Sequence, residues 1–325
     1  MLTLYETSKK GLRPCEYSPP GEFPKNVVWI DMVQPSPEEE QAVEHALHVN
    51  VPTREELQEI EVSSRLYKER DALFMTATVI SHADTPRPET TTVTFVLIGE
   101  RLISVRYVAL EPFNLFLSPQ GREGYPSSDG QIVLMGLLDA IVDRVADVLE
   151  QAGRDFDGVS YEIFSRNEIK TGEGASSTLQ GFLQRIGRSG DVNSKVSESL
   201  VSLARLLAFL GAQGTLKRPE VNSLLEILDR DVKSLTSQAS FLSDKANFLL
   251  AANLGMINIE QTDIVKIFSV AAVIFLPPTL VASIYGMNFQ FMPELHWLLG
   301  YPFAIVLMIL SALVPYRYFK RRGWL

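Results

Sequence analysis

Residues 264–285 read IVKIFSVAAVIFLPPTLVASIY, and residues 298–318 read LLGYPFAIVLMILSALVPYRY. Neither residues 267–293 nor residues 295–316 contain a charged side chain. A helix needs about 20 apolar residues to cross the ~30 Å hydrocarbon layer of a bilayer, and each segment has that length. The two segments therefore predict a hairpin of membrane-spanning helices, joined by a short loop.

The charges beside the second segment predict its orientation. The basic residues Arg317, Lys320, Arg321 and Arg322 follow it, and basic residues next to a span stay on the cytoplasmic side. The first residues, MLTLYETSKKGL, lack the apolar core of a signal peptide. We therefore expect a multi-pass protein of the cell (inner) membrane with both termini in the cytoplasm. The connecting loop then lies outside the cell, where its one acid, Glu294, attracts cations.

The charge distribution argues against nucleic acid as a partner. The chain has 325 residues and a net charge of −9. Residues 264–325 hold five basic and one acidic side chain, which leaves 25 basic and 38 acidic side chains for residues 1–263. A part of the chain with a charge of −13 repels nucleic acid and concentrates cations. We also find no phosphate-binding glycine loop, nucleophile elbow or HExxH motif, so the sequence does not indicate an enzyme.

The part before the spans predicts an α+β cytosolic domain. Residues 73–81, 91–98 and 101–108 are β-rich runs separated by turn residues, which favours a largely antiparallel sheet. Ser36-Pro-Glu-Glu-Glu predicts a capped helix start, and residues 131–152 place apolar side chains at helical spacing. We therefore expect a mixed sheet with flanking helices in this domain.

A very long helix is predicted to connect this domain to the membrane. Lys217-Arg218-Pro219-Glu220 has the features of a helix start, and the helical pattern then continues to Tyr285. Sixty-seven residues at 1.5 Å each would span ~100 Å. The expected organisation is a cytosolic funnel domain (1–218), a stalk helix (219–263), a first span (264–285), an external loop (286–297), a second span (298–318) and a basic tail (319–325).

Two spans cannot enclose an ion path, so a pore requires several copies of the chain around an axis. Helical spacing back from Tyr285 defines one face of the helix, formed by Ser283, Thr279, Leu276, Ala272, Phe268, Val265 and Thr262. Polar ends and an apolar middle suit a pore that closes by dewetting. The alternative is that the hydroxyl groups only bond back to their own helix or pack against other helices.

The turn after the first span offers cation ligands. Gly286 lets the backbone leave the helix, and the last helical carbonyls carry partial negative charge. A ring of Asn288 amide oxygens would present neutral acceptors to magnesium, which sheds its water reluctantly. The alternative is a simple Gly/Asn cap at a membrane surface.

The sequence Tyr285-Gly286-Met287-Asn288, between two spans and followed by a basic tail, resembles the CorA family of magnesium and cobalt transporters. The resemblance implies a homopentamer in membrane lipid, with a cytosolic funnel and a pore lined by the first span. It further implies that Gly286, Met287 and Asn288 form an outer selectivity ring for hydrated Mg²⁺, with Co²⁺ or Ni²⁺ as possible further substrates. Thr279 would then be a polar ring inside the pore, and Leu276 and Phe268 would form the constriction.

Family resemblance also implies that cytosolic Mg²⁺, bound at acidic residues between subunits, closes the pore. Glu226, Asp229 and Asp231 on the upper stalk are the candidates, and a solvated helix face is the alternative for each. Two other functions stay open. One is a zinc, cobalt or nickel transporter of the same fold, against which Met287 favours magnesium. The other is a signalling or enzymatic domain anchored by the hairpin, which requires a catalytic constellation in residues 1–263.

Overall fold

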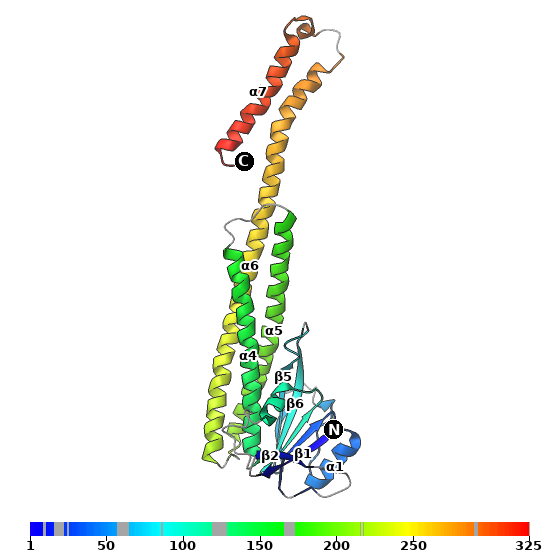
Figure 1. Cartoon of the computed structure of the whole chain (residues 1–325), viewed down its shortest axis with the longest axis vertical. Helices are drawn as coiled ribbons and strands as arrows, with labels where there is room; N and C mark the ends of the chain where they lie inside the picture. Colours follow the sequence, from blue (N-terminus) through cyan, green and yellow to red (C-terminus); the bar gives the residue numbers. More distant parts are fainter. Residues whose placement is uncertain are drawn as a thin grey trace. The chain divides into compact units, whose positions relative to one another are not determined.

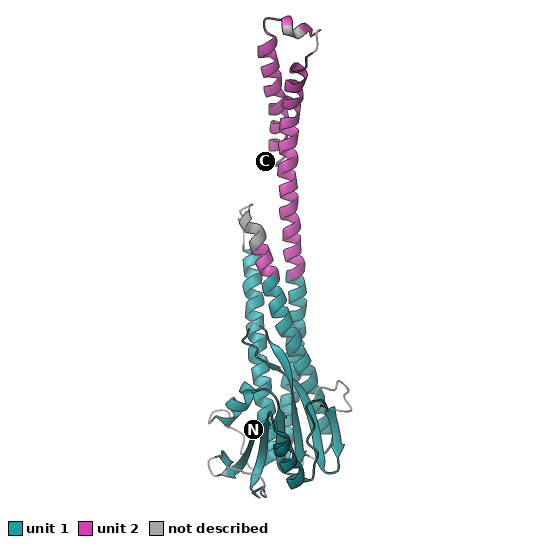
Figure 2. Cartoon of the chain, turned by 90° about the vertical axis from the view of Figure 1, so that its right-hand side faces the viewer, with its two compact units in different colours: residues 1–165, 184–249 teal, residues 166–183, 250–325 magenta. Residues whose placement is uncertain are grey.

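The computed structural model describes residues 1–8, 11–15, 23–24, 26–56, 65–85, 87–118, 129–165, 173–214, 216, 218–288 and 292–324, without the side chains of residues 173–177, 294 and 295. The chain divides into two compact units (Figure 2). The first unit contains residues 1–165 and 184–249, and the second contains residues 166–183 and 250–325.

A seven-stranded sheet forms one part of the first unit (Figure 1). Its strands are β1 (Leu2–Ser8), β2 (Gly11–Cys15), β3 (Val27–Val33), β4 (Leu66–Glu69), β5 (Ala72–Ser81), β6 (Glu89–Ile98) and β7 (Arg101–Arg106). Their order is β2-β1-β3-β7-β6-β5-β4, and every neighbouring pair is antiparallel except β3 and β7. The prediction of a mixed, largely antiparallel sheet is therefore confirmed.

Short helices flank the sheet. Helix α1 (Pro37–Leu47) begins with the predicted cap, because Ser36 and Glu39 form a reciprocal capping box. Helix α3 (Glu111–Leu117) follows β7 and buries Phe113 and Phe116 against Trp29 of β3. These rings close one face of the sheet, and β5 is buried along its whole length.

A buried ion pair joins the two parallel strands. Arg106 of β7 donates from Nη2 to Asp31 Oδ2 of β3 at 2.7 Å and from Nε to Oδ1 at 3.2 Å. Ser104 donates to the same Oδ1 at 2.7 Å and accepts from the Trp29 indole at 2.9 Å. The Arg106 guanidinium lies 4.3 Å from the centre of the Phe113 ring. Both charges are thus paired and hydrogen-bonded, as burial requires.

Helix α4 (Gly130–Phe164) begins against the sheet at a position that only glycine can occupy without a shift. Gly130 donates its N–H to the carbonyl of Glu100 at 2.6 Å. A Cβ atom at this residue would lie 2.5 Å from the backbone nitrogen of Leu102. Asp129 caps the helix by accepting the N–H groups of Gln131 and Ile132. The start of α4 is therefore fixed on β7.

Two further long helices complete the chain before the hairpin turn. Helix α5 covers Glu173–Ala212 and helix α6 covers Pro219–Tyr285. In the first unit α4, α5 and the N-terminal part of α6 run side by side (Figure 1), and Lys245 of α6 bonds Asp157 of α4 at 2.5 Å. The prediction of one uninterrupted helix over residues 219–285 is confirmed.

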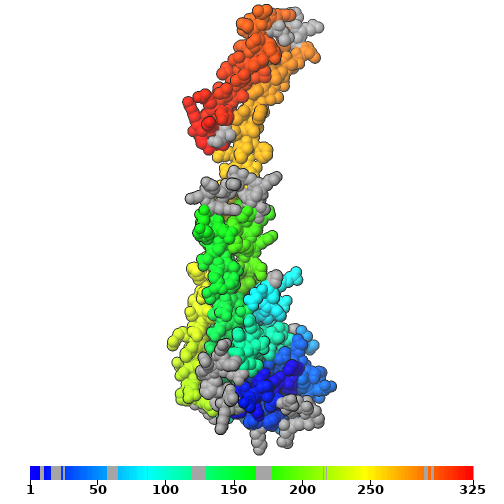
Figure 3. All heavy atoms as spheres, viewed as in Figure 1, coloured from blue at the N-terminus to red at the C-terminus, as the bar shows by residue number. Residues whose placement is uncertain are grey.

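The second unit contains the C-terminal part of α6, a 3₁₀ turn (Pro293–His296) and helix α7 (Gly300–Arg321). Figure 3 shows α7 beside the end of α6. Both helices contain a stretch long and apolar enough to cross a membrane, and few side chains of that stretch are buried within the chain. The second predicted span, residues 298–318, therefore corresponds to a helix that begins two residues later and ends three residues later.

Candidate ion-conducting site

One side of α6 packs against α7 within the chain. Val270 is only 2% exposed, and Ala304 of α7 is buried as well. At 100° of rotation per residue, the half-buried positions between residues 263 and 285 of α6 lie within about 100° of Val270. These positions are Asp263, Lys266, Ala271, Ile274, Pro277, Pro278, Val281 and Tyr285.

The predicted pore face lies on the opposite side of α6. Within the first span its residues are rotated by about 160–240° from Val270, and each of them is exposed in the single chain. They are Val265, Phe268, Ala272, Leu276, Thr279 and Ser283. Phe268 is 72% exposed and Leu276 is 65% exposed. The chain therefore leaves this face free for contact with further copies or with an aqueous path, and its role as a pore lining stays a prediction.

The prolines of α6 belong to the other side of the helix. Pro277 and Pro278 are half-buried on the side that faces α7, and the helix continues through them. Each proline lacks an N–H, so the helical carbonyls four residues earlier lose their usual donors. The two prolines therefore do not lie on the predicted pore face.

The hydroxyl of Thr279 bonds back to its helix. Its Oγ1 donates to the carbonyl of Phe275 at 2.7 Å, as Ser and Thr often do inside helices. This bond uses the hydroxyl proton and leaves the oxygen lone pairs facing outward as acceptors. A Thr279 hydroxyl that bonds back to its own helix can therefore still line a pore. The water molecules around a cation donate hydrogen bonds outward, and the Thr279 oxygen can accept them.

The predicted selectivity tripeptide lies at the C-terminal end of α6. Gly286 donates to the Ala282 carbonyl at 2.9 Å, and Met287 donates to the Ile284 carbonyl at 3.3 Å. A Cβ atom at Gly286 would lie 3.1 Å from the Ala282 oxygen, which is tighter than ordinary contact. Asn288 is exposed and makes no hydrogen bond to other described residues. The residue lies just after the C-terminal end of α6, where the helix dipole is negative.

Part of the expected external site lies outside the described residues. Residues 289–291 and the side chain of Glu294 belong to this part.

The three candidate regulatory acids have different surroundings. Asp229 pairs with Lys233 at 2.5 Å, one helical turn away. Glu226 is exposed on α6. Asp231 lies close enough to Asp143 of α4 to influence its charge state, as described next. The structure thus does not bring the three acids together into one site.

Sequence reasoning missed a row of acids on α4. Burial raises the pKa of Asp143, and the nearby carboxylates of Asp139, Asp147 and Asp231 raise this pKa further. The spacing of four residues between Asp139, Asp143 and Asp147 places them on one helix face, and this spacing was visible in the sequence. No group of three or more His, Cys, Asp or Glu side chains within the described part of the chain is arranged to hold a metal ion by itself.

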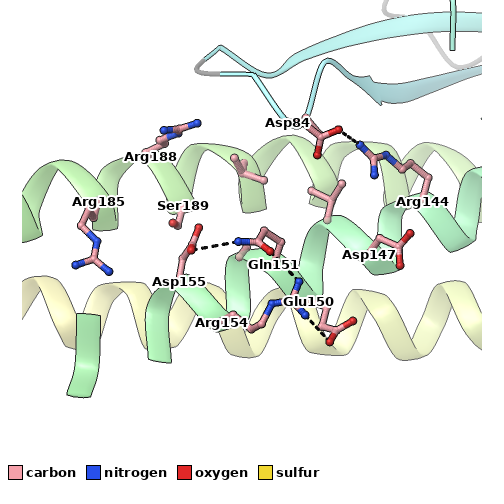
Figure 4. Close-up of a pocket in the computed structure, with 14 residues that line it drawn as sticks. Asp84, Arg144, Asp147, Glu150, Gln151, Arg154, Asp155, Arg185, Arg188 and Ser189 are labelled. Carbon is pink, nitrogen blue, oxygen red and sulfur yellow. Dashed lines mark hydrogen bonds and ion pairs between the residues drawn. The ribbon is translucent and has the colours of Figure 1, made fainter. Parts of the chain in front are cut away.

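The first unit also contains a groove of about 630 Å³ between α4, α5 and the loop after β5 (Figure 4). Arg144 bonds Asp84 and also pairs with Glu111 at 3.2 Å. Arg154 pairs with Glu150 at 2.6 Å. No His or Cys is among the residues that line this groove, so it lacks the common base and the common thiol of a hydrolytic site. The Arg144 pairs connect α4 to the loop after β5 and to α3, and the Arg154 pair lies within α4.

Known proteins match this chain over nearly its whole length. Residues 24–321 match the family model described as "CorA-like Mg2+ transporter protein". The chain is 38% identical over 305 residues to the magnesium transport protein CorA of Sodalis glossinidius, with 92% of both sequences covered. It is 38% identical over 300 residues to the protein of the same name from Escherichia coli K12, again with 92% of both covered.

Solved structures show the same fold at low sequence identity. The complete structure of the CorA magnesium transporter from Methanocaldococcus jannaschii superimposes with a TM-score of 0.79 at 17% identity, covering 100% of this chain and 99% of that one. The full-length CmaX protein superimposes with a TM-score of 0.70 at 15% identity. The cytoplasmic domain of ZntB from Vibrio parahaemolyticus gives 0.57 at 11% identity and covers 79% of this chain.

Proposed function

Because this chain belongs to the family of CorA-like Mg²⁺ transporter proteins, we propose that it is a channel that carries magnesium into the cell. The observation that supports this most directly is the free face of α6, which is apolar from Phe268 to Leu276, becomes polar at Thr279 and Ser283, and ends beside Asn288. Such a face suits the wall of a narrow pore that conducts a hydrated ion. The family is one of transporters and not of enzymes.

The membrane potential supplies the driving force in this proposal. Moving one elementary charge through 100 mV is worth about 2.3 kcal/mol, so a dication gains about 4.6 kcal/mol. This is enough for uptake without ATP, and the sequence contains no phosphate-binding loop.

The assembly we propose is a homopentamer in the cell (inner) membrane, with both termini in the cytoplasm. The funnel is formed by residues 1–218, the stalk by 219–263 and the pore by 264–285. The loop 286–297, the second span 298–318 and the basic tail 319–325 complete the chain. Several copies are required because a single α6 and a single α7 cannot surround a path.

The outer end of the pore selects the ion in our proposal. Five copies of Gly286-Met287-Asn288 would place a ring of amide oxygens where the α6 dipoles are negative. Neutral oxygens bind a hydrated dication without trapping it. The same ring would also pass Co²⁺ or Ni²⁺, and Glu294 would attract cations to the entrance.

We expect Leu276→Asn to raise magnesium flux several-fold when the channel is closed. Leu276 would be part of the apolar constriction, and a polar amide there removes the barrier that dewetting imposes. Leu276→Ala, which stays apolar at the same position, is the matched control. Isotope or dye flux at high internal magnesium provides the measurement, and equal flux in the Asn variant and the parent would remove Leu276 from the constriction.

Cytosolic magnesium closes the pore in our proposal, and Asp231 is the strongest of the three candidate sensors. Since the carboxylates of Asp139, Asp147 and Asp231 each repel that of Asp143, a divalent cation would relieve this repulsion. We expect Asp231→Asn to raise the internal magnesium concentration that halves flux. Asp229→Asn should do so less, because Lys233 already neutralises Asp229. Unchanged inhibition in Asp231→Asn would exclude it as a sensor, and Glu226→Asn tests the remaining candidate in the same assay.

Flux into proteoliposomes with an imposed potential tests the proposed function itself. The purified protein should admit Mg²⁺ faster at an inside-negative potential, and Co²⁺ and Ni²⁺ should compete with it. Uptake of Zn²⁺ but not Mg²⁺ would favour the zinc-transporting alternative. No uptake of any of these ions by an intact oligomer would favour the membrane-anchored domain.

A further inference from the structure

Two asparagines occupy core positions in an otherwise mainly apolar helix seam. Most buried residues of α5 recur every three or four positions, as in a coiled coil. They are Leu179, Phe182, Ile186, Ser189, Asn193, Val196, Leu200, Leu203, Leu207 and Leu210, and Ser199 and Leu206 are buried beside this series. Asn193 is 2% exposed, and Asn253 of α6, which continues the buried series Val232, Ala239, Leu242 and Leu249, is fully buried.

Each of these amides bonds the partner helix through its nitrogen. In the first unit, Asn193 Nδ2 donates to the Ala239 carbonyl of α6 at 2.9 Å and to Ser243 Oγ at 2.8 Å. In the second unit, Asn253 Nδ2 donates to the Leu179 carbonyl of α5 at 2.9 Å. A backbone carbonyl only accepts hydrogen bonds, so the nitrogen, and not the amide oxygen, must face it. The orientation of both amides is thereby determined.

The two bonds specify the same register of α5 against α6. From Asn193 to Leu179, α5 runs back by 14 residues, and from Ala239 to Asn253, α6 runs forward by 14 residues. Fourteen residues are two heptads, after which a coiled-coil position repeats. In an antiparallel pair of helices, any offset that is not a whole number of heptads takes an amide out of the seam. An offset of a whole heptad keeps backbone acceptors for both amides but loses the Ser243 hydroxyl.

Both amide oxygens have no hydrogen-bond partner within the described residues. An unpaired buried oxygen lowers stability, and leucine would fill such a core position with a purely apolar side chain. A polar residue that is retained in a coiled-coil core at this cost characteristically fixes the register. Stability alone therefore does not account for Asn193 and Asn253.

We propose that Asn193 and Asn253 are positioning residues, which set the axial register of α6 on α5 and thereby the position of the pore-lining face. This inference rests on the proposed function, because the pore face belongs to the same uninterrupted helix. A slip of α6 by one heptad would leave small or apolar residues in the seam. Asn193 would then meet Ala246 and Leu250 in place of Ala239 and Ser243 and would lose its hydroxyl partner. The loss of the bond from Asn193 to the Ser243 hydroxyl is what disfavours such a slip.

Disulfide cross-linking measures the register directly. In a Cys15→Ser background, Ile186→Cys with Ala246→Cys repeats the relation of Asn193 to Ala239 one heptad away, so this pair should cross-link in the parent register. Leu200→Cys with Ala239→Cys reports the slip of one heptad that brings Asn193 to Ala246, and this pair should not cross-link in the parent. In the double variant Asn193→Leu, Asn253→Leu, we expect the slipped pair to cross-link several-fold more than it does in the parent.

Two further variants make the result specific to the seam. Asn247→Leu replaces an exposed asparagine of α6 and should leave the cross-linking pattern unchanged. The exchange Asn193→Ser with Ser243→Asn restores an amide and a hydroxyl across the same two positions. This exchange should return the parent pattern, whereas either single substitution should not.

Channel function gives the second readout. The double leucine variant should melt at the same temperature as the parent or higher, while the internal magnesium concentration that halves its flux shifts several-fold. A purely structural role predicts the reverse, a lower melting temperature with unchanged inhibition. An unchanged cross-linking pattern would overturn the register assignment, and a changed pattern with unchanged inhibition would overturn the positioning role. If the parent itself passes no magnesium, the proposed function is wrong, but the cross-linking pattern still tests the register of α5 against α6.

Discussion

Asn288→Ala is expected to reduce magnesium flux by about 10–100-fold, the loss typical when a group that orients the shell around a metal is removed. The proposed ring holds the ion through its water, so each lost amide removes an acceptor from that shell. Alanine cannot replace the acceptor. The Asn288 side chain makes no hydrogen bond to other described residues, so the substitution should leave folding and assembly intact.

The measurement is flux into proteoliposomes at a fixed inside-negative potential, with size-exclusion chromatography of each variant. His296→Ala, an exposed residue between the same two helices, is the matched control and should conduct normally. Competition by Co²⁺ and Ni²⁺ should weaken together with magnesium flux. Parent-like magnesium uptake in Asn288→Ala, from an oligomer of unchanged size, would contradict the selectivity ring and leave the turn as a helix cap.

Asp31→Ala is expected to cost about 3–5 kcal/mol of folding stability, because it leaves the buried Arg106 charge without its partner. The free energy of unfolding of a typical domain is only about 5–15 kcal/mol, so the first unit would lose much of its stability. The same substitution takes away the acceptor of the Ser104 hydroxyl. Urea unfolding of the parent and the variant measures the difference through the shift in midpoint.

Two controls distinguish the effect of burying an ion pair from the effect of the charges themselves. Glu162→Ala removes the partner of Arg185 in an exposed pair, where a loss of at most about 1 kcal/mol is expected. Asp31→Leu combined with Arg106→Met removes both buried charges and should recover most of the stability lost in Asp31→Ala. An Asp31→Ala midpoint equal to that of the parent would show that the pair contributes little.

Local signals were sufficient to predict the long helix and its limits. Pro219 suits the first turn of a helix and Gly286 suits its end, and between them nothing but the proline pair interrupts the helical pattern. The spans were equally predictable, because length and the absence of charge decide them. The turn at Asn288 was recognisable because its residues carry the resemblance to a family.

Features that depend on distant residues were not predictable. The parallel pairing of β3 with β7 joins Trp29 to Leu102, and no local pattern specifies a partner so far along the chain. The approach of Asp231 to the α4 acids also depends on how two helices pack. The sequence shows each row of acids, but only the fold determines which rows meet.

Every strand in the described part of the chain lies within residues 2–106, and this has a consequence for how the protein is made. Between Arg106 and the first apolar segment at residue 264 lie 157 residues. At about 5–20 residues per second, the ribosome needs roughly 8–30 s to synthesise them. The sheet, with its fully buried strand β5, therefore has time to close in water before any membrane-spanning segment exists. Its apolar strands are thus already paired when the chain reaches the insertion machinery. The two C-terminal helices are then the apolar segments left for insertion into the bilayer.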